Sequence, residues 1–323
     1  MGKTDEPVYD LLVIGGGPAG YTAAIYGARG GLSVLVLEQL SAGGQMALTS
    51  QVDNYPGFPE STDGFLLGES MQKQAEQFGA RTKLAEVRVL DLAEPLKIAG
   101  TSSGRFYGRA LIFAAGAVPR KLNLAGEEAL TGRGVHYCAA CDGMAYRNQT
   151  VMVVGGGNSA VEDALHLSRL AKKVILVHRR DALRAEKIMQ DALEAMPNVE
   201  YVWNSTVTAL HAGDSGMLTH VTLQNLSSGV FSDVPVDGLF VSIGRQPASE
   251  LVRGQVDLDP AGYVLADETT RTSVPGVFAA GDVRTKPLRQ IVTATADGAV
   301  AAYFAQSYLD HHLFSRNHLK CFW

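Results

Sequence analysis

The sequence predicts an α/β fold made of two similar units, the second inserted into the first. Two glycine-rich segments, residues 11–20 and 151–160, each begin as an apolar run typical of a buried strand. They align at a constant offset of 140 residues, and further apolar runs at 34–37 and 174–177 keep that offset. Both copies follow the order strand, glycine turn, helix, strand, which binds a pyrophosphate at the helix N-terminus. We therefore expect two Rossmann-like dinucleotide-binding domains, each with a three-layer ββα architecture.

The first glycine turn is expected to hold a dinucleotide. The residues of the turn that approach the ligand are Gly15, Gly17, Pro18, Ala19 and Gly20. The second strand of this copy ends in Glu38, whose carboxylate can accept hydrogen bonds from both ribose hydroxyls and would repel a 2′-phosphate. This copy therefore favours FAD or NAD.

The second glycine turn carries different chemistry at the matching position. His178 replaces the carboxylate, and Arg179, Arg180 and Arg184 follow it. Guanidinium groups bind phosphate in a bidentate manner, so the cluster favours the 2′-phosphate of NADPH. A solvated basic helix start is the alternative. Further candidates for this site are Gly157, Asn158, Ser159 and Glu162, of which the last two are equally compatible with helix capping or an ordinary surface.

A C-x-x-C pair, Cys138 and Cys141, comes just before the second glycine turn. Two thiols at this spacing can close a disulfide, and such a thiol can be ionised near neutral pH. The pattern indicates electron transfer through a disulfide. Half of a zinc site is the alternative, but Cys321 and His136 alone do not complete a four-ligand pattern, so we predict no metal ligands. For His136 a hydrogen-bonded structural role is favoured over tuning of Cys138.

The predicted domain boundaries lie where strand-like runs meet glycine or proline. The first domain covers 1–117 and 247–310, and its first part ends at the small-residue turn of Ala115 and Gly116. The inserted domain covers 118–246 and carries the cysteine pair. The two crossovers are suited to a hinge.

The end of the chain contains a further strand and a helix. Residues 277–282 are typical of a buried strand ending in an acid, and 291–303 of an alanine-rich helix. Residues 311–323 form an atypical aromatic tail, expected either to fray or to fold back and stack on a cofactor ring, with docking slightly favoured. Cys321, in this tail, is expected to be kinetically silent.

Composition restricts the classes of function. The chain has 323 residues, 46% of them hydrophobic and 19% charged, as is usual for globular proteins of about two domains. A net charge of −5 argues against non-specific nucleic-acid binding. The first seven residues lack an apolar signal region, and no apolar stretch approaches the ~20 residues that span a bilayer. Three cysteines suit a reducing compartment, so we expect a cytoplasmic protein without membrane or nucleic-acid partners.

The motifs together resemble the low-molecular-weight, bacterial-type thioredoxin reductases of the class II pyridine nucleotide-disulfide oxidoreductase family. The resemblance covers residues from about 8 to 310. Besides the two glycine turns, the segments that carry it are 43–45, 54–57, 138–143, 178–185, 281–282 and 289–290. The position of the thiols in the second nucleotide domain distinguishes this family from the glutathione-type flavoenzymes.

The resemblance implies further residues of an FAD site. These are Gly44, Gln45, Asn54, Ala115, Gly116, Gly281, Asp282, Arg289, Gln290 and Ile291. It implies that Asp282 binds the ribityl chain and that 289–291 line the flavin edge. Gln45 and Asn54 are equally compatible with ordinary turns, and Asp282 is compatible with a helix cap.

The resemblance also implies an activity, that of an NADPH-linked thioredoxin-disulfide reductase. Electrons would pass from NADPH through FAD to the Cys138–Cys141 disulfide and then to thioredoxin or a thioredoxin-like protein, with a homodimer as the assembly. Cys141 would lie next to the flavin and Cys138 would attack the substrate. Asp142 would shuttle a proton, which requires a pKa raised by desolvation, or would instead cap the following turn.

Three other functions remain open from the sequence. A small-molecule dithiol oxidase has no use for the arginine cluster, which counts against it. A ferredoxin-linked reductase is favoured only by the unusual tail. A redox sensor, in which the disulfide state controls partner binding, would not turn over a protein disulfide with NADPH.

Overall fold

The computed structural model describes residues 7–49, 52–93 and 95–318, and the side chains as far as His311. The chain divides into two compact units, one formed by Met1–Val118 with Gln246–Trp323 and the other by Pro119–Arg245. The two chain crossings form short strands, β7 (Ala117–Pro119) and β16 (Arg245–Pro247), which pair with each other. Among the described residues, no helix has the length and apolar character needed to cross a membrane.

The first unit is built on a seven-stranded sheet with the order β3-β2-β1-β6-β5-β4, in which β17 also pairs with β6. Strands β1, β2, β3, β6 and β17 run parallel, and β4 and β5 add an antiparallel edge. The strands are β1 (Val8–Ile14), β2 (Val34–Glu38), β3 (Arg81–Leu84), β4 (Val87–Asp91), β5 (Lys97–Thr101), β6 (Gly104–Phe113) and β17 (Val277–Ala279).

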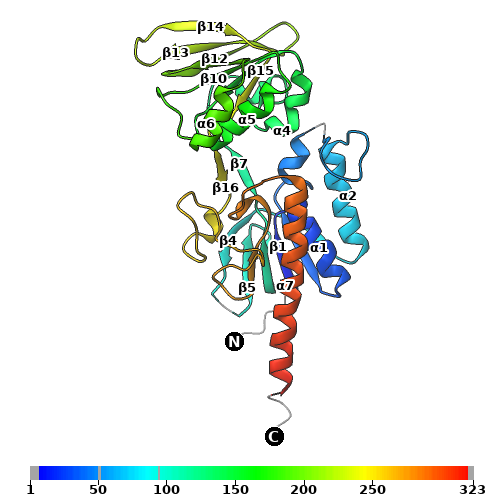
Figure 1. Ribbon diagram of the computed structural model, residues 1–323. Coiled ribbons are helices and arrows are strands. Elements are labelled where there is room, and N and C mark those ends of the chain that lie inside the picture. Colours follow the sequence, from blue (N-terminus) through cyan, green and yellow to red (C-terminus); the bar gives the residue numbers. More distant parts are fainter. Residues whose placement is uncertain (1–6, 50–51, 94, 319–323) are drawn as a thin grey trace. The chain divides into compact units, whose positions relative to one another are not determined.

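Alternating residues of β1 pack on the two faces of this sheet. Leu11 and Val13 join the core with α1 (Pro18–Arg29), α2 (Gly64–Gln77) and α7 (Ile291–His318), and α1 and α7 lie side by side (Figure 1). Leu12 and Ile14 join a second core on the opposite face. The shorter helical turns of this unit are η1 (Gly44–Leu48), η3 (Glu250–Val252) and η4 (Gly281–Val283).

The second unit has three layers. Its central five-stranded sheet, ordered β11-β10-β9-β15-β8, is entirely parallel. The layer on one face is helical, and a three-stranded antiparallel sheet ordered β12-β13-β14 covers the other. The prediction of two Rossmann-like domains is confirmed, and the ββα order of layers is seen in the second unit.

The central strands of the second unit are β8 (Val135–His136), β9 (Thr150–Val154), β10 (Lys173–Val177), β11 (Val199–Val202) and β15 (Gly238–Val241). The covering sheet consists of β12 (Ser205–Ala212), β13 (Leu218–Asn225) and β14 (Phe231–Pro235). The helices are α3 (Glu127–Leu130), α4 (Ala139–Asp142), η2 (Gly143–Tyr146), α5 (Asn158–Ser168) and α6 (Lys187–Glu194).

The C-terminal helix corrects one expectation. The helix expected over 291–303 continues to His318, so residues 311–318 extend α7 instead of folding back as a separate tail. No glycine or proline interrupts the sequence after Gly298, which is the physical reason for the longer helix. Cys321, Phe322 and Trp323, on which the stacking expectation rests, lie outside the described residues.

Candidate functional site

The first glycine turn connects β1 to α1 and is tightly packed. Gly15 has a φ of +102°, and a methyl group on Gly20 would lie 1.9 Å from the Gly15 carbonyl oxygen. Only glycine allows this positive φ and this close packing of helix on turn. Glu38, at the end of β2, accepts a hydrogen bond from the Gly16 N–H at 2.6 Å and one from the Leu40 N–H at 3.0 Å. The carboxylate therefore faces the turn.

The amides predicted for the FAD site lie close together although they are distant in sequence. Asn54 Nδ2 donates a hydrogen bond to Gln290 Oε1 at 3.1 Å, and Ile291 begins α7 directly after it. Gln45 is exposed on η1, where Gly44 has a φ of +56°.

A small-residue turn follows β6 in the same unit. Ala115 and Gly116 are half-buried there, and Gly116 has a φ of +74°. Pro18 and Ala19 open α1, and Gly17 is its N-cap.

The turn that carries Gly281 and Asp282 is held by a residue that the sequence analysis missed. Asp297, buried on α7, accepts hydrogen bonds from the Gly281 N–H at 2.9 Å, from Arg284 Nη2 at 2.7 Å and from Lys286 Nζ at 2.7 Å. Burial alone would raise the pKa of Asp297, but the bonds from Arg284 and Lys286 outweigh it and lower the pKa below its usual value. The only sequence signal was one acid within an alanine-rich helix.

Arg289 also contacts this turn. Its guanidinium lies 4.0 Å from the centre of the Tyr263 ring and donates to the Asp282 carbonyl oxygen at 3.3 Å. The cation–π contact fixes the direction of the side chain. Arg289 thus contributes to the shape of the turn within the described chain.

The second glycine turn connects β9 to α5. His178, directly after β10, is only 4% exposed, and a methyl group on Gly156 would lie 2.3 Å from its ring. Its Nε2 is buried without a hydrogen-bond partner in the described part of the chain. Burial, followed by the charges of Arg184, Arg179 and Arg180, lowers the pKa of His178.

The ring of His178 packs against the turn and its pKa is lowered, and its part in the nucleotide site stays a prediction. The three arginines are exposed and supply the positive charge. They lie in a loop, not at the start of a helix, because α6 begins only at Lys187.

The loop that carries the arginines is attached to the second turn. The Arg184 N–H donates to the Gly156 carbonyl oxygen at 2.7 Å. Asn158 is bonded twice to Glu186, through the Glu186 N–H at 2.9 Å and its own amide at 3.2 Å. Asn158 therefore holds the loop in place. Ser159 and Glu162 are exposed on α5, and Gly157 is its N-cap.

The cysteine pair forms a disulfide in the second unit. The Cα atoms of Cys138 and Cys141 are 5.3 Å apart, Cys138 is the N-cap of α4, and Cys141 lies within that helix. Asp142 ends α4 and its Oδ2 lies 3.2 Å from His136 Nδ1. The other ring nitrogen, Nε2, lies 2.6 Å from the Tyr146 hydroxyl.

The direction of these hydrogen bonds follows from their partners. With the Asp142 carboxylate oxygen as acceptor, the Nδ1–H of His136 donates to it, and in that tautomer Nε2 accepts from the Tyr146 hydroxyl. Burial, followed by the charges of Asp142 and Asp237, raises the pKa of Tyr146 to about 12, which keeps this hydroxyl protonated. The hydrogen-bonded role expected for His136 is therefore observed.

The Asp142 side chain is 27% exposed, and its role as a proton shuttle stays a prediction. Its side chain also makes no capping hydrogen bond to η2, which excludes the capping role. The contact with His136 is what fixes its orientation.

A second missed carboxylate lies beside the redox helix. Asp163, on α5, accepts a hydrogen bond from the Ser242 hydroxyl. Burial raises its pKa to about 6, a charge on Glu162 adds to this, and Ser242, Arg245 and the Ala139 N–H partly oppose it. In the sequence, Asp163 is a charged residue of a helix, and nothing in the pattern around it predicts that its side chain is buried.

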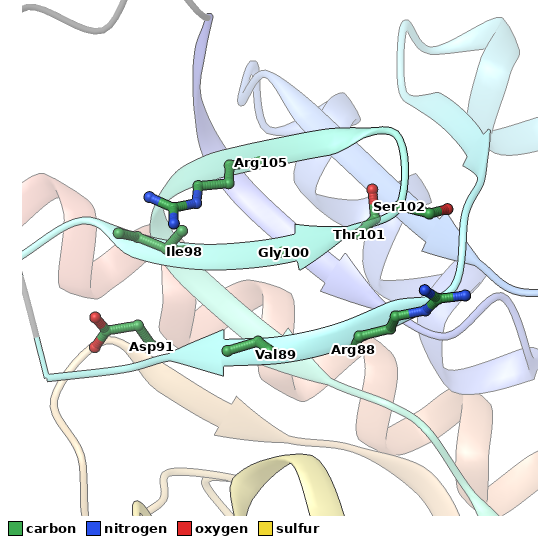
Figure 2. Close-up of a pocket in the computed structure, with 8 residues that line it drawn as sticks. All are labelled: Arg88, Val89, Asp91, Ile98, Gly100, Thr101, Ser102 and Arg105. Atoms are coloured by element: carbon green, nitrogen blue, oxygen red, sulfur yellow. The ribbon is translucent and has the colours of Figure 1, made fainter.

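A separate hollow lies on β4, β5 and the start of β6, with a volume of about 430 Å³ (Figure 2). Figure 2 shows the side chains of Arg88, Arg105 and Asp91 around it. No residue predicted for the nucleotide or redox sites lines it, and Arg88 is already paired with Glu86 at 3.0 Å. The hollow is not part of the site described above.

Comparisons with known proteins agree with this geometry. The family described as pyridine nucleotide-disulphide oxidoreductase matches residues 9–298. The thioredoxin reductases of Listeria innocua and Bacillus subtilis are 45% and 43% identical over 307 residues, which is 95% of this chain and 96% of each relative. The crystal structure of thioredoxin reductase from Streptococcus pyogenes is similar with a TM-score of 0.87 and 42% identity, covering 94% of this chain and 99% of that one. The chain therefore belongs to the pyridine nucleotide-disulphide oxidoreductase family.

Proposed function

We propose that the protein is an NADPH-dependent thioredoxin reductase. Electrons pass from NADPH through FAD to the Cys138–Cys141 disulfide and from there to the disulfide of thioredoxin or a thioredoxin-like protein. The observation that carries this proposal is the presence of the disulfide and of the exposed arginine loop within one compact unit. The curated relatives named thioredoxin reductase support it.

The first glycine turn fits FAD. A methyl group on Gly17 would meet no described atom nearer than the Gly43 carbonyl oxygen, at 4.0 Å, so a pyrophosphate can approach the backbone there. Glu38 faces the turn and would bind the ribose hydroxyls. The residues that complete this site are Gly15, Pro18, Ala19, Gly20, Gly44, Gln45, Asn54, Ala115, Gly116, Gly281, Asp282, Arg289, Gln290 and Ile291.

The second glycine turn fits NADPH. A methyl group on Gly157 would meet no described atom within 4 Å, which leaves the start of α5 open to a pyrophosphate. Arg179, Arg180 and Arg184 would bind the 2′-phosphate through charge-assisted hydrogen bonds. Asn158 holds the arginine loop, and His178 packs against the glycine turn. Ser159 and Glu162 face solvent on α5.

The redox chemistry uses the two sulfurs in sequence. FAD, when bound, supplies the two-electron carrier between the nicotinamide and the disulfide. Reduction opens the Cys138–Cys141 bond, and the Cys138 thiolate attacks the substrate disulfide to form a mixed disulfide. Attack by Cys141 then re-forms the protein disulfide and releases the reduced substrate. Asp142, oriented by His136, is placed to exchange a proton with the departing sulfur.

The proposal extends to the assembly and the compartment. The protein acts as a homodimer in the cytoplasm, as the resemblance to the bacterial-type enzymes implies. The low count of three cysteines supports a reducing compartment.

The test is reduction of the flavin and of thioredoxin by the purified enzyme. Stopped-flow absorbance should show rapid bleaching of the flavin with NADPH and slower or weaker bleaching with NADH. Cys138→Ser and Cys141→Ser should each abolish thioredoxin reduction while FAD remains bound and is still reduced by NADPH. Thioredoxin reduction in either single variant would contradict the proposal, as would equal flavin bleaching by both nucleotides.

A further inference from the structure

The antiparallel sheet of the second unit brings two histidines into direct register. His211 on β12 pairs with His220 on β13, and Thr222 on β13 pairs with Asp233 on β14. Residues two apart on one strand share a face, so all four side chains lie on the same face of the sheet. The opposite face carries Val221 and other buried residues that pack on the central sheet. The two histidines therefore lie on the outer face.

The imidazole rings are held in place by neighbouring hydroxyl groups. The rings of His211 and His220 are stacked, with centres 4.2 Å apart and planes at 3°. His211 Nε2 lies 2.8 Å from Thr222 Oγ1, which donates to Asp233 Oδ1 at 2.6 Å. His220 Nδ1 lies 3.1 Å from Thr219 Oγ1, which donates to the His211 carbonyl oxygen at 3.2 Å.

These bonds fix the tautomer of each ring. Each threonine hydroxyl has one hydrogen and gives it to an oxygen, so it can only accept from the histidine that it contacts. One nitrogen of each neutral ring therefore carries a hydrogen and the other keeps its lone pair. An imidazole oriented by a hydrogen bond through one nitrogen is the usual arrangement of a metal-binding histidine.

We propose that His211, His220 and Asp233 bind a divalent transition-metal ion on the outer face of this sheet. One ligand atom from each side chain lies within 4.8 Å of the other two. Two donors that share an ion at 2.0–2.2 Å lie about 3–3.5 Å apart, so the side chains must move to bind it. Asp233 is exposed on the edge strand β14 and can rotate. An imidazole binds an ion in the plane of its ring, so the rings of His211 and His220 must also turn out of their parallel stack.

The donor set selects the class of ion. Two imidazoles with one carboxylate suit Zn²⁺, Ni²⁺ or Cu²⁺ and disfavour Mg²⁺ and Ca²⁺, which prefer oxygen ligands. Three protein ligands leave at least one position for water. Because His211, His220 and Asp233 come from three adjacent strands, a bound ion would join β12, β13 and β14 and slow their local opening.

The test is a titration of the full-length, FAD-loaded enzyme with Zn²⁺ at pH 7.5. The enzyme is kept oxidised, so that Cys138 and Cys141 remain in their disulfide, and it carries Cys321→Ser to remove the third thiol. Isothermal titration should show one site that His211→Gln or His220→Gln weakens by more than about ten-fold, because losing a ligand costs at least as much as losing its outer hydrogen-bond partner. His166→Gln, which changes a histidine on α5 outside the cluster, is the matched control and should bind as the parent does.

Two further measurements make the result decisive. Co²⁺ should give visible d–d bands without a thiolate charge-transfer band, and His220→Gln should remove them. Hydrogen exchange should show that Zn²⁺ protects amides of 205–235 in the parent and not in His211→Gln. Zinc binding that survives in the double variant His211→Gln/His220→Gln, or a parent enzyme that binds no Zn²⁺ at 1 mM, would overturn the proposal.

Discussion

The two glycine turns of this chain both connect a strand to a helix and differ in the side chain, at or directly after the end of the second strand, that contacts the turn. In the first unit Glu38 reaches the turn and accepts the Gly16 N–H at 2.6 Å. In the second unit the corresponding His178 packs over Gly156, and a loop of exposed arginines follows it. The backbone provides the place for a pyrophosphate in both units, and the end of the second strand decides which ribose is accepted.

The turns also differ in how tightly the helix packs on the strand. Gly20 in the first unit corresponds to Ala160 in the second, where the methyl group is fully buried. A methyl group at position 20 would lie 1.9 Å from the Gly15 carbonyl oxygen, whereas the second turn accommodates the methyl group of Ala160. Similar sequence motifs therefore conceal different steric limits.

The largest expected effect concerns the arginine loop, which has no counterpart in the first unit. Changing Arg179 and Arg180 together to Ala should remove charge-assisted hydrogen bonds that contribute about 1.5–3 kcal/mol each. NADPH affinity should fall by at least tens-fold, and NADH affinity should change little. Stopped-flow titration of flavin reduction measures both.

The control for this prediction is Lys187→Ala, because Lys187 is a nearby cation already paired with Asp191 at 2.7 Å. It should leave the preference between the two nucleotides as it is. An equal loss of affinity for NADPH and NADH in the arginine variant would show that the loop does not recognise the 2′-phosphate.

Local sequence predicts these turns well because their geometry depends on residues that are close along the chain. The strand, glycine turn and helix at 11–20 can be assigned without knowledge of distant contacts, and so can the C-x-x-C disulfide. Asp297 and Asp163 could not be assigned, since their partners Gly281 and Ser242 lie 16 and 79 residues away. Periodicity does not reveal such partners.

The burial of His178 and the length of α7 were not evident from the sequence. His178 follows a central strand and is buried against the second glycine turn, although its neighbours in the sequence are exposed arginines. The stacked pair of His211 and His220 likewise depends on strand register, which the sequence does not specify. For α7 the aromatic content of the last residues outweighed the lack of a helix breaker.

The next effect is expected when the residues at the equivalent positions 20 and 160 of the two turns are exchanged. Gly20→Ala would place a methyl group 1.9 Å from the Gly15 carbonyl oxygen and should destabilise the first unit by about 2–3 kcal/mol, with loss of bound FAD. Ala160→Gly should cost about 1–2 kcal/mol, from backbone entropy and the loss of a buried methyl group, and should keep FAD bound. Urea unfolding and the FAD content of the purified proteins report both. Equal stability of the two variants would mean that the turns are not sterically different.

A smaller effect is expected at Asp163, whose counterpart in the first unit is the buried Ala23. Burial raises the pKa of Asp163 from 3.8 to about 6, so the folded state holds this proton more tightly than the unfolded state. Below pH 3.8 the carboxyl group therefore does not lower the free energy of unfolding. Its destabilising effect grows as the pH rises to about 6. As the pH rises from 5 to 7.5, the free energy of unfolding of Asp163→Asn should therefore increase by about 1–1.5 kcal/mol relative to that of the parent.

Urea denaturation of the parent and of Asp163→Asn at several pH values measures this difference. The amide oxygen of asparagine can still accept the Ser242 hydroxyl, so the variant isolates the charge. Glu162→Gln, an exposed neighbour on the same helix, should show no comparable gain. Parallel stability curves for the parent and Asp163→Asn would show that the carboxylate titrates normally.

The smallest effect is expected from the end of the chain. Helix α7 begins beside the first glycine turn, where a methyl group on Gly298 would lie 2.1 Å from the Ala19 carbonyl oxygen. A helix rises 1.5 Å per residue, so position 311 lies about 30 Å from Ile291 along the axis. Asp310 and His311 are exposed, and Figure 1 shows α7 running on beyond the sheet of its own unit. Deleting 311–323 should therefore leave flavin fluorescence, the Michaelis constant for NADPH and turnover within about two-fold of the parent values. Loss of an aromatic contact with a cofactor, which contributes about 0.5–1.5 kcal/mol, would change them by more than that. A larger change would place the last residues against a cofactor, in this chain or in a second copy, and Cys321→Ser would then show whether the thiol takes part.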